Sequence, residues 1–200
     1  MQSERLQRVL ARIDQLNSED PNTELVDGVA RPRELVYAER LTTWVLRLNP
    51  NASEALRIAA RGQHVQRWTI PRERYERNRR GYLRWREVLK AFHAQTVVQI
   101  MREKGYPDDV VQRVERLIKK KDLAADPDTQ TLEDALCLVF LETQFGDLKQ
   151  KTPEDKMREI IRKTWQKMSE HSRAEALRLN LRPEDRDFLS RALNAPKNAP

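Results

Sequence analysis

Apolar residues recur every three or four positions along most of this 200-residue chain, and this spacing constrains the fold more than any other feature. In the first run, residues 4–17, the apolar positions are Leu6, Val9, Leu10, Ile13 and Leu16. Breaks that contain proline separate the later runs, at residues 20–22, 49–51, 70–71 and 126–128. Strand-like alternation is hard to find anywhere. We therefore expect an all-α protein with no sheet.

The later runs predict where further helices begin and end. A second helix should begin at Pro32 and end before residue 49, a third should end near Trp68, and a long one should run from Gly81 to about Gly105. Others are expected over residues 107–120, 132–145 and 152–168, with two shorter helices after them. Length and composition suit one compact multi-helix domain over residues 1–194, followed by a disordered tail at residues 195–200.

Cysteine usage and hydropathy indicate the compartment. Cys137 is the only cysteine, so it forms no internal disulfide, and its apolar neighbours suggest that it packs as a small hydrophobe. A reducing compartment fits best. The N-terminus lacks a charged-then-apolar signal, and no uncharged apolar stretch is long enough to cross a bilayer. We expect a cytoplasmic protein without a membrane partner.

The net charge of +7 comes from one segment of the chain. Residues 57–90 contain eleven Arg or Lys and three Glu, a net charge of +8, so the remaining residues sum to −1. Such an asymmetry is what an anionic partner requires. The alternative is that these arginines only solvate a face, with their stems covering apolar surface.

Arginine forks suit phosphate oxygens, so the arginines of this segment are candidate substrate-binding residues. The ones we single out are Arg61, Arg72, Arg74, Arg80 and Arg84. Tyr75 and Tyr82 are candidate stacking platforms for nucleic-acid bases. Tyr82 and Trp85, however, fall at core spacing, so we expect both to be buried.

Several ionisable residues occur where the helical period calls for an apolar one. Glu39 shares the stripe of Leu35 and Thr42, His64 follows Ala60 by four residues, His93 follows Leu89 by four, and Asp134 precedes Leu138 by four. Burial favours such groups when a cation compensates their desolvation. Glu39, His64, His93 and Asp134 are therefore candidate ligands of a divalent metal ion, Zn, Mn or Fe. Glu133 and Glu142 flank the same surface and are candidate catalytic carboxylates.

Each of these residues also has a purely structural interpretation. A lone inward histidine is more often a hydrogen-bonded core residue than a ligand. Glu39 could pair with Arg40, Arg57 or Arg61 as an ion bridge, and Asp134 could complete a capping box with Thr131. The remaining histidine, His171, lies in an exposed-looking stretch and is left out of the site.

The motifs of several enzyme classes do not occur in the chain, namely a Gly-rich phosphate loop, a nucleophile elbow, paired CxxC and a two-histidine zinc helix. Our leading functional prediction is a metal-dependent hydrolase acting on a phosphorylated small molecule or nucleotide, since a metal-bound water could attack a phosphoester. The alternative is a non-enzymatic RNA-binding module that uses residues 57–90.

Short motifs along nearly the whole chain resemble an uncharacterised helical family, domain of unknown function 4202, some of whose members carry a glutamyl-tRNA synthetase label. The resemblance rests on Ile13-Asp14, Asp20-Pro21, Glu39-Arg40, Ala59 to His64 and on to Trp68, Tyr82 to Arg86, His93, Leu132 to Asp134 with Glu142, and Lys163 to Trp165 with Lys167 to Ser169. It implies a helical fold and no established activity.

A weaker resemblance is to the HD-domain metal-dependent phosphohydrolases, which carry a histidine, a His-Asp pair and a later aspartate on successive helices. It places Glu39 at the first histidine, His64 at the pair and Asp134 at the last aspartate, with His93 as an added ligand. Val65 stands where the pair has its aspartate. This resemblance implies an HD-like helical site.

Overall fold

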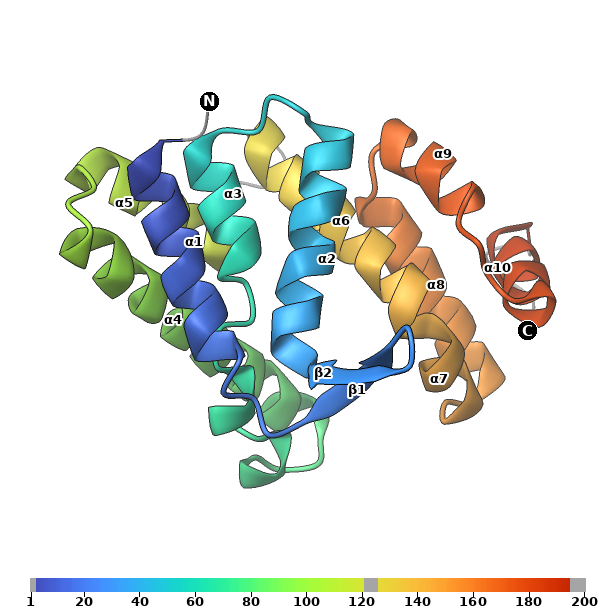
Figure 1. Ribbon diagram of the computed structural model, residues 1–200. Coiled ribbons are helices and arrows are strands. Elements are labelled where there is room, and N and C mark those ends of the chain that lie inside the picture. The colour runs from blue at the N-terminus through green and yellow to red at the C-terminus, as the bar shows by residue number, and fades with distance from the viewer. Residues whose placement is uncertain (1–2, 121–125, 195–200) are drawn as a thin grey trace. The chain divides into compact units, whose positions relative to one another are not determined.

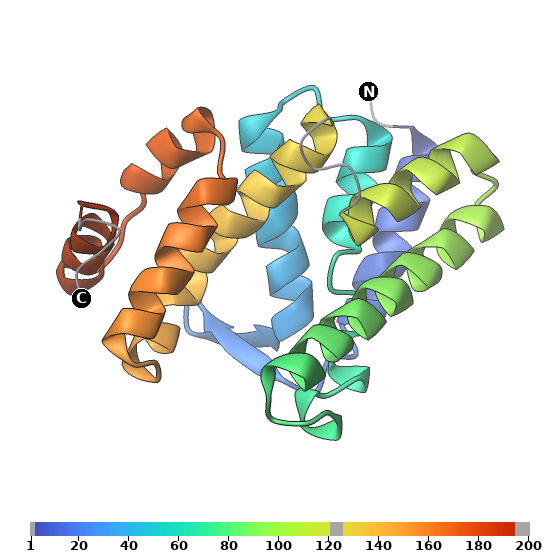
Figure 2. The same ribbon diagram turned by 180° about the vertical axis from the view of Figure 1, so that it is seen from behind.

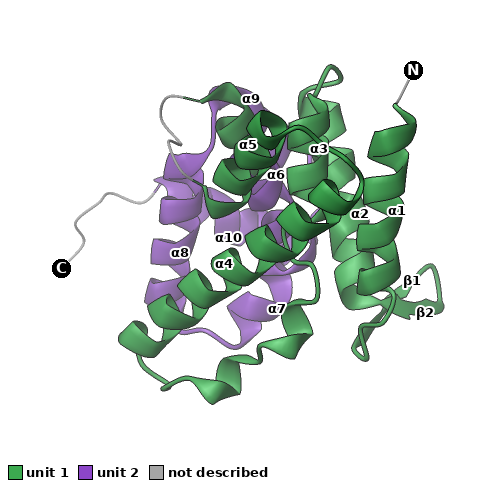
Figure 3. Cartoon of the chain, turned by 90° about the vertical axis from the view of Figure 1, so that its left-hand side faces the viewer, with its two compact units in different colours: residues 1–132 green, residues 133–200 purple. Residues whose placement is uncertain are grey.

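A computed structural model describes residues 3–120 and 126–194, and most of these residues are helical (Figure 1). The all-α prediction is confirmed. The chain divides into two compact units, residues 1–132 and 133–200 (Figure 3), and the boundary falls inside one helix, α6 (Pro127–Thr143). One domain over residues 1–194 stays a prediction, and the predicted tail at residues 195–200 lies outside the described residues.

In the first unit, α3 (Glu54–Arg61) is the central helix. It packs against α1 (Glu4–Asn17), α2 (Arg33–Leu48) and α5 (Asp108–Lys119). The long helix α4 (Arg79–Glu103) packs along α5, as Figure 2 shows, and also contacts α1. Gly105, in the turn between α4 and α5, has a φ of 72°, which only glycine adopts without strain. The predicted end of the long helix near Gly105 is therefore confirmed.

The expectation of no sheet is wrong at one place. Strands β1 (Thr23–Val26) and β2 (Val29–Pro32) form an antiparallel hairpin in which Val26 pairs with Val29. Asp27 and Gly28 make the two-residue turn with φ values of 51° and 80°. Asp-Gly is a strong hairpin signal because both turn positions need a positive φ. The strands are only four residues long, too short for alternation to stand out in the sequence.

The third helix ends earlier than predicted. α3 stops at Arg61 rather than near Trp68, and residues 62–66 form a turn that places His64 outside any helix. At the end of this turn Gln66 has a φ of 51°, and its N–H donates to the buried Asn17 Oδ1 at 3.1 Å. Two short 3-10 helices, η1 (Arg67–Thr69) and η2 (Arg72–Arg74), then lead to α4.

Up to residue 194, the described part of the second unit contains the rest of α6 and four further helices. These are α7 (Phe145–Gln150), α8 (Glu154–Lys167), α9 (Glu170–Leu177) and α10 (Pro183–Asn194). α8 packs against α7 and α10, and Leu138, Phe145 and Met157 are fully buried. Cys137 is buried, as predicted. In the described part of the chain no helix combines the length and apolarity needed to span a membrane.

Gly62 allows the chain that follows α3 to lie directly against α4. A Cβ atom at this position would lie 2.3 Å from Val97 Cγ2, a fully buried atom of α4. Gly62→Ala should therefore lower the free energy of unfolding by about 1 to 3 kcal/mol, the usual cost of overpacking a core. Chemical denaturation measures this change.

The double variant Gly62→Ala/Val97→Ala provides the control. Truncating Val97 removes the clashing methyl groups, so the two substitutions should cost less together than the sum of their separate costs. Strictly additive costs would show that Gly62 is not needed for this approach.

Candidate functional site

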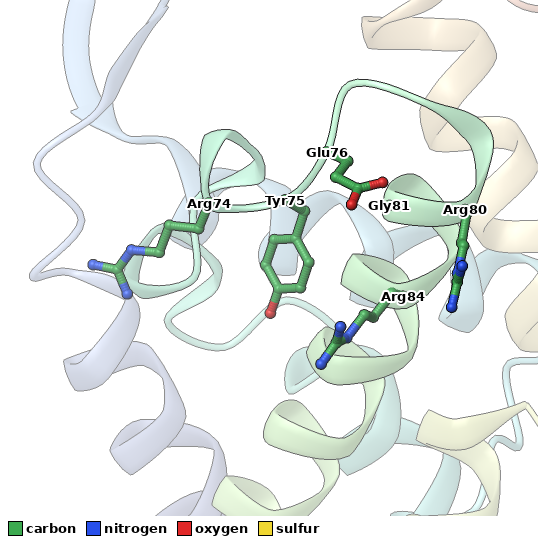
Figure 4. A pocket seen from close by; sticks show the side chains of 6 residues that line it. All are labelled: Arg74, Tyr75, Glu76, Arg80, Gly81 and Arg84. Carbon is green, nitrogen blue, oxygen red and sulfur yellow. The ribbon is translucent and has the colours of Figure 1, made fainter.

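A pocket of about 530 Å³ lies at the start of α4 (Figure 4). Its lining residues come from the end of η2, from the segment that links η2 to α4 and from the first turns of α4 itself: Arg74, Tyr75, Glu76, Arg80, Gly81 and Arg84. We call it the arginine pocket. It brings together three of the five arginines that the sequence pointed to as phosphate-binding residues.

Arg72, the fourth of these arginines, shapes the pocket without lining it. Its Nη1 donates to the carbonyl oxygen of Tyr75 at 2.8 Å, and its Nη2 donates to those of Glu76 at 2.6 Å and Asn78 at 3.4 Å. These bonds fold the linking segment around one guanidinium. Hydrogen bonds from a charged guanidinium to carbonyl oxygens are stronger than those between neutral groups, so these contacts stabilise the fold of the segment.

The start of α4 closes against the same segment. The Asn78 side chain accepts a hydrogen bond from the Gly81 N–H at 2.8 Å, which caps the helix. A Cβ atom on Gly81 would lie 2.2 Å from the Glu76 carbonyl oxygen, so only glycine permits this approach. The pocket therefore has a backbone frame that is fixed by local interactions.

The three pocket arginines have no direct ion-pair partner in the described chain. Arg74, Arg80 and Arg84 are exposed, and within residues 3–120 and 126–194 no ion pair or hydrogen bond engages their guanidinium groups. Glu76 is the acid of the pocket lining, and its Oε2 accepts from Asn78 Nδ2 at 2.8 Å. The pocket is thus strongly positive.

Arg61, the fifth predicted arginine, has a different role. Its Nε and Nη2 donate to the two carboxylate oxygens of Asp14 at 2.6 and 2.9 Å, and the pair is partly buried. This bidentate bridge ties the end of α3 to α1. Arg61 does not line the arginine pocket, so we leave it out of the site.

A second polar cluster lies in the first unit, around His64. Glu34 Oε2 lies 3.2 Å from His64 Nδ1, and Arg67 Nη1 lies 3.4 Å from His64 Nε2. A guanidinium can only donate, so His64 Nε2 accepts from Arg67. In a neutral His64 ring the proton then lies on Nδ1, which donates to Glu34 Oε2. The His64 ring also stacks on Tyr37, with centroids 4.0 Å apart and an interplanar angle of 8°.

His93 lies beside this cluster, with its ring centroid 6.0 Å from that of His64. Its Nδ1 lies 2.9 Å from the Val65 carbonyl oxygen, which can only accept, so Nδ1 carries the proton. Its Nε2 is buried and has no hydrogen-bond partner among the described residues. His64 and His93 were both predicted to face inward, and the structure brings them together.

Burial shifts the protonation of all three groups. Desolvation raises the pKa of Glu34 to about 7, against a smaller opposing effect of Arg67. It lowers the pKa of His93 to about 3, with His64 as the next cause. Burial, followed by the charge of Arg67, also holds the pKa of His64 well below its ordinary value. Both histidines are therefore neutral at pH 7, and Glu34 is the group that titrates there.

Glu39, the predicted metal ligand on α2, bonds elsewhere. Its Oε1 accepts from Arg31 Nη2 of β2 at 2.8 Å, rather than from any of the three arginines proposed for a structural bridge. Glu34 contacts His64 in its place. Five residues along a helix turn through about 140° beyond a full rotation, so Glu34 and Glu39 point to different sides of α2.

Asp134 belongs to the second unit and joins α6 to α9. Its carboxylate accepts hydrogen bonds from the N–H and Oγ of Ser169 at 2.8 and 2.6 Å and from Ser172 Oγ at 2.9 Å. The capping box with Thr131 is wrong, because α6 begins at Pro127 and Asp134 lies within it. Asp126 Oδ2 instead accepts from Thr129 Oγ1 at 2.5 Å at the start of the helix.

The candidate catalytic carboxylates are also in the second unit. Glu133 is buried and pairs with Lys167 at 3.2 Å, whereas Glu142 is exposed. Within the part of the chain that the structure describes, no three His, Cys, Asp or Glu side chains are grouped to hold a metal ion. The four-ligand metal site and the catalytic role of these glutamates stay predictions. His171 is exposed, as expected.

Sequence reasoning missed Glu34 and Arg67. The signal for Glu34 was present, since it precedes Tyr37 by three residues and Leu41 by seven, and all three are buried on one face of α2. The inward stripe predicted from the sequence lies one residue later, on Leu35 and Thr42, which are only partly buried. Arg67 carried no such signal, because its position depends on the turn after α3.

Glu34→Gln should remove a loss of stability that the parent protein shows as the pH rises. Glu34 keeps its proton to about pH 7 in the folded protein but loses it near pH 4.5 when unfolded, so its contribution to stability falls as pH rises between these values. Glutamine does not titrate, so its contribution to stability does not change over this pH range. The free energy of unfolding of the variant relative to the parent should rise by up to about 3 kcal/mol from pH 5 to pH 8.

Urea unfolding at several pH values measures this difference. The depressed pKa values of His64 and His93 make stability rise with pH in both proteins, so they cancel in the comparison. A difference that stays constant with pH would refute the raised pKa of Glu34.

Comparison with known proteins gives a family and no function. No curated protein and no solved structure matches the chain. One family model, described as a domain of unknown function (DUF4202), matches residues 7–189, which is nearly the whole chain and includes the arginine pocket and the His64 cluster. The chain therefore belongs to the DUF4202 family.

Proposed function

We propose that the protein binds a phosphate-bearing anion, a phosphorylated small molecule or a nucleotide, in the arginine pocket. The observation that carries this proposal is the meeting of Arg74, Arg80 and Arg84 at one pocket without a partner for any of their guanidinium groups in the described chain. Guanidinium forks match phosphate oxygens in geometry and charge. The segment around the pocket also carries the whole positive excess of the protein.

Three arginines on other helices of this protein are paired with acidic residues, and the pocket arginines differ from them. Arg8, Arg158 and Arg191 each bond to an acidic residue four positions earlier on the same helix. Such pairs add modestly to the stability of a solvated helix. The pocket arginines have no such partner, although Glu76 precedes Arg80 by four residues and lines the same pocket.

The position of the pocket at the start of α4 strengthens the case. The first turn of α4 contains no acidic residue and begins with Arg79 and Arg80, whereas each of the other α-helices described has an acidic residue in its first turn. Cations at the positive end of the helix dipole cost about 0.3 to 1 kcal/mol. A bound anion would remove this repulsion.

Metal-dependent hydrolysis of the ligand and a cytoplasmic location stay predictions within this proposal. The divalent metal ion would need ligands beyond those that the described residues group together. Phosphate binding by the arginine pocket requires no metal ion, so it can be tested separately.

Binding of inorganic pyrophosphate, measured by isothermal titration calorimetry at fixed ionic strength, tests the proposal. Arg80→Gln and Arg84→Gln should each weaken binding about tenfold, since a charged hydrogen bond contributes about 1.5 kcal/mol. Arg116→Gln is the matched control. It removes an exposed arginine of α5 without a partner among the described residues, and should change the affinity less than twofold.

Two results would contradict the proposal. One is a parent protein that shows no binding of pyrophosphate at millimolar concentration. The other is an equal loss of affinity in all three variants, which would mean that only net charge matters and not the pocket.

A further inference from the structure

The arginine pocket contains two residues that a plain phosphate ion would not need, Tyr75 and Glu76. We infer that the ligand is a nucleoside phosphate. Its phosphates lie against the arginines, its base stacks on the Tyr75 ring, and Glu76 accepts a hydrogen bond from a ribose hydroxyl or a base amino group. This inference rests on the proposed function and adds the part of the ligand that is not phosphate.

Tyr75 offers an aromatic face inside the pocket. Figure 4 shows its ring between the side chains of Arg74 and Arg84. No hydrogen bond or ring contact within the described part of the chain engages this side chain. Its backbone is held in place, because Arg72 donates to its carbonyl oxygen at 2.8 Å. A positioned ring beside cationic groups is the arrangement that stacks nucleic-acid bases.

Glu76 is the residue that most clearly distinguishes a nucleotide from a bare anion. A carboxylate in a phosphate pocket repels the phosphate, so it weakens binding unless the ligand also brings a donor. Asn78 occupies its Oε2 at 2.8 Å, and Oε1 remains available as an acceptor. Ribose hydroxyls and base amino groups are donors of this kind, and phosphate oxygens are not.

The size of the pocket agrees with such a ligand. Its volume of about 530 Å³ lies within the range of about 300 to 1,000 Å³ that is typical of small-molecule and cofactor sites. A phosphate or pyrophosphate ion alone would leave much of this space to water.

A single-stranded nucleic acid is the competing ligand. Tyr82 is 43% exposed, so the expectation that it is buried is wrong. Arg86 Cζ lies 5.8 Å from the centroid of its ring. Tyr82 does not line the arginine pocket, however. The aromatic ring that the pocket itself provides is Tyr75, which favours a single nucleotide.

The test compares ADP with pyrophosphate by calorimetry on the full chain, with folding of each variant checked by circular dichroism. Tyr75→Leu should raise the Kd for ADP about fivefold or more, as the loss of one base stack predicts, and leave the Kd for pyrophosphate within twofold. Tyr82→Leu removes an exposed tyrosine outside the pocket and should leave both unchanged. Glu76→Gln should tighten pyrophosphate binding and lower the preference for ADP over pyrophosphate about threefold.

Each contrary outcome has a distinct meaning. Pyrophosphate binding that depends on Arg80 and Arg84, together with ADP binding that Tyr75→Leu does not change, would overturn the nucleotide inference and leave the proposed function intact. Loss of ADP affinity in Tyr82→Leu but not in Tyr75→Leu would overturn it in favour of an extended nucleic acid. Binding of neither ligand would remove both.

Discussion

The hydrogen bonds of one guanidinium shape the candidate site. Arg72 donates to three carbonyl oxygens of the segment that links η2 to α4, those of Tyr75, Glu76 and Asn78. Glycine at position 81 then lets α4 begin in contact with that segment. The neighbouring Arg74, Arg80 and Arg84 have no partner for their guanidinium groups among the described residues. A pocket built in this way is preorganised, and a ligand does not have to order the loop that binds it.

The buried polar cluster connects to this frame through Trp85. Arg67 contacts His64 on one side and lies over the Trp85 ring at 4.7 Å, and Arg72 lies over the same ring at 6.0 Å. Trp85 donates from Nε1 to the Ile70 carbonyl oxygen at 2.9 Å. An indole that two guanidinium groups share is a favourable cation–π arrangement. The core group that titrates near neutral pH, Glu34, is therefore linked by contacts to the segment that forms the pocket.

The sequence predicted the helices well and the site only in part. Helical spacing placed α1, α5 and α8 almost to the residue, because period and capping are local properties. It also singled out Arg74, Arg80 and Arg84, which the structure brings to one pocket, since an excess of charge is visible in composition; their binding role stays a prediction. It could not show that Arg72 and Arg61 are used in structural bonds, because those partners are set by turns and by a contact 47 residues apart. The predicted set of metal ligands required inward residues of different helices to lie close together. A pattern along one helix does not show where the side chains of another helix lie.

The shape of the pocket depends most on the hydrogen bonds of Arg72, and Arg72→Lys tests this most directly. Lysine keeps the charge but cannot hold three carbonyls in a planar fork. We expect this variant to remain folded and to bind pyrophosphate about tenfold more weakly by calorimetry, although Arg72 does not line the pocket. A folded Arg72→Lys protein that binds pyrophosphate as tightly as the parent would show that Arg72 does not shape the anion-binding pocket.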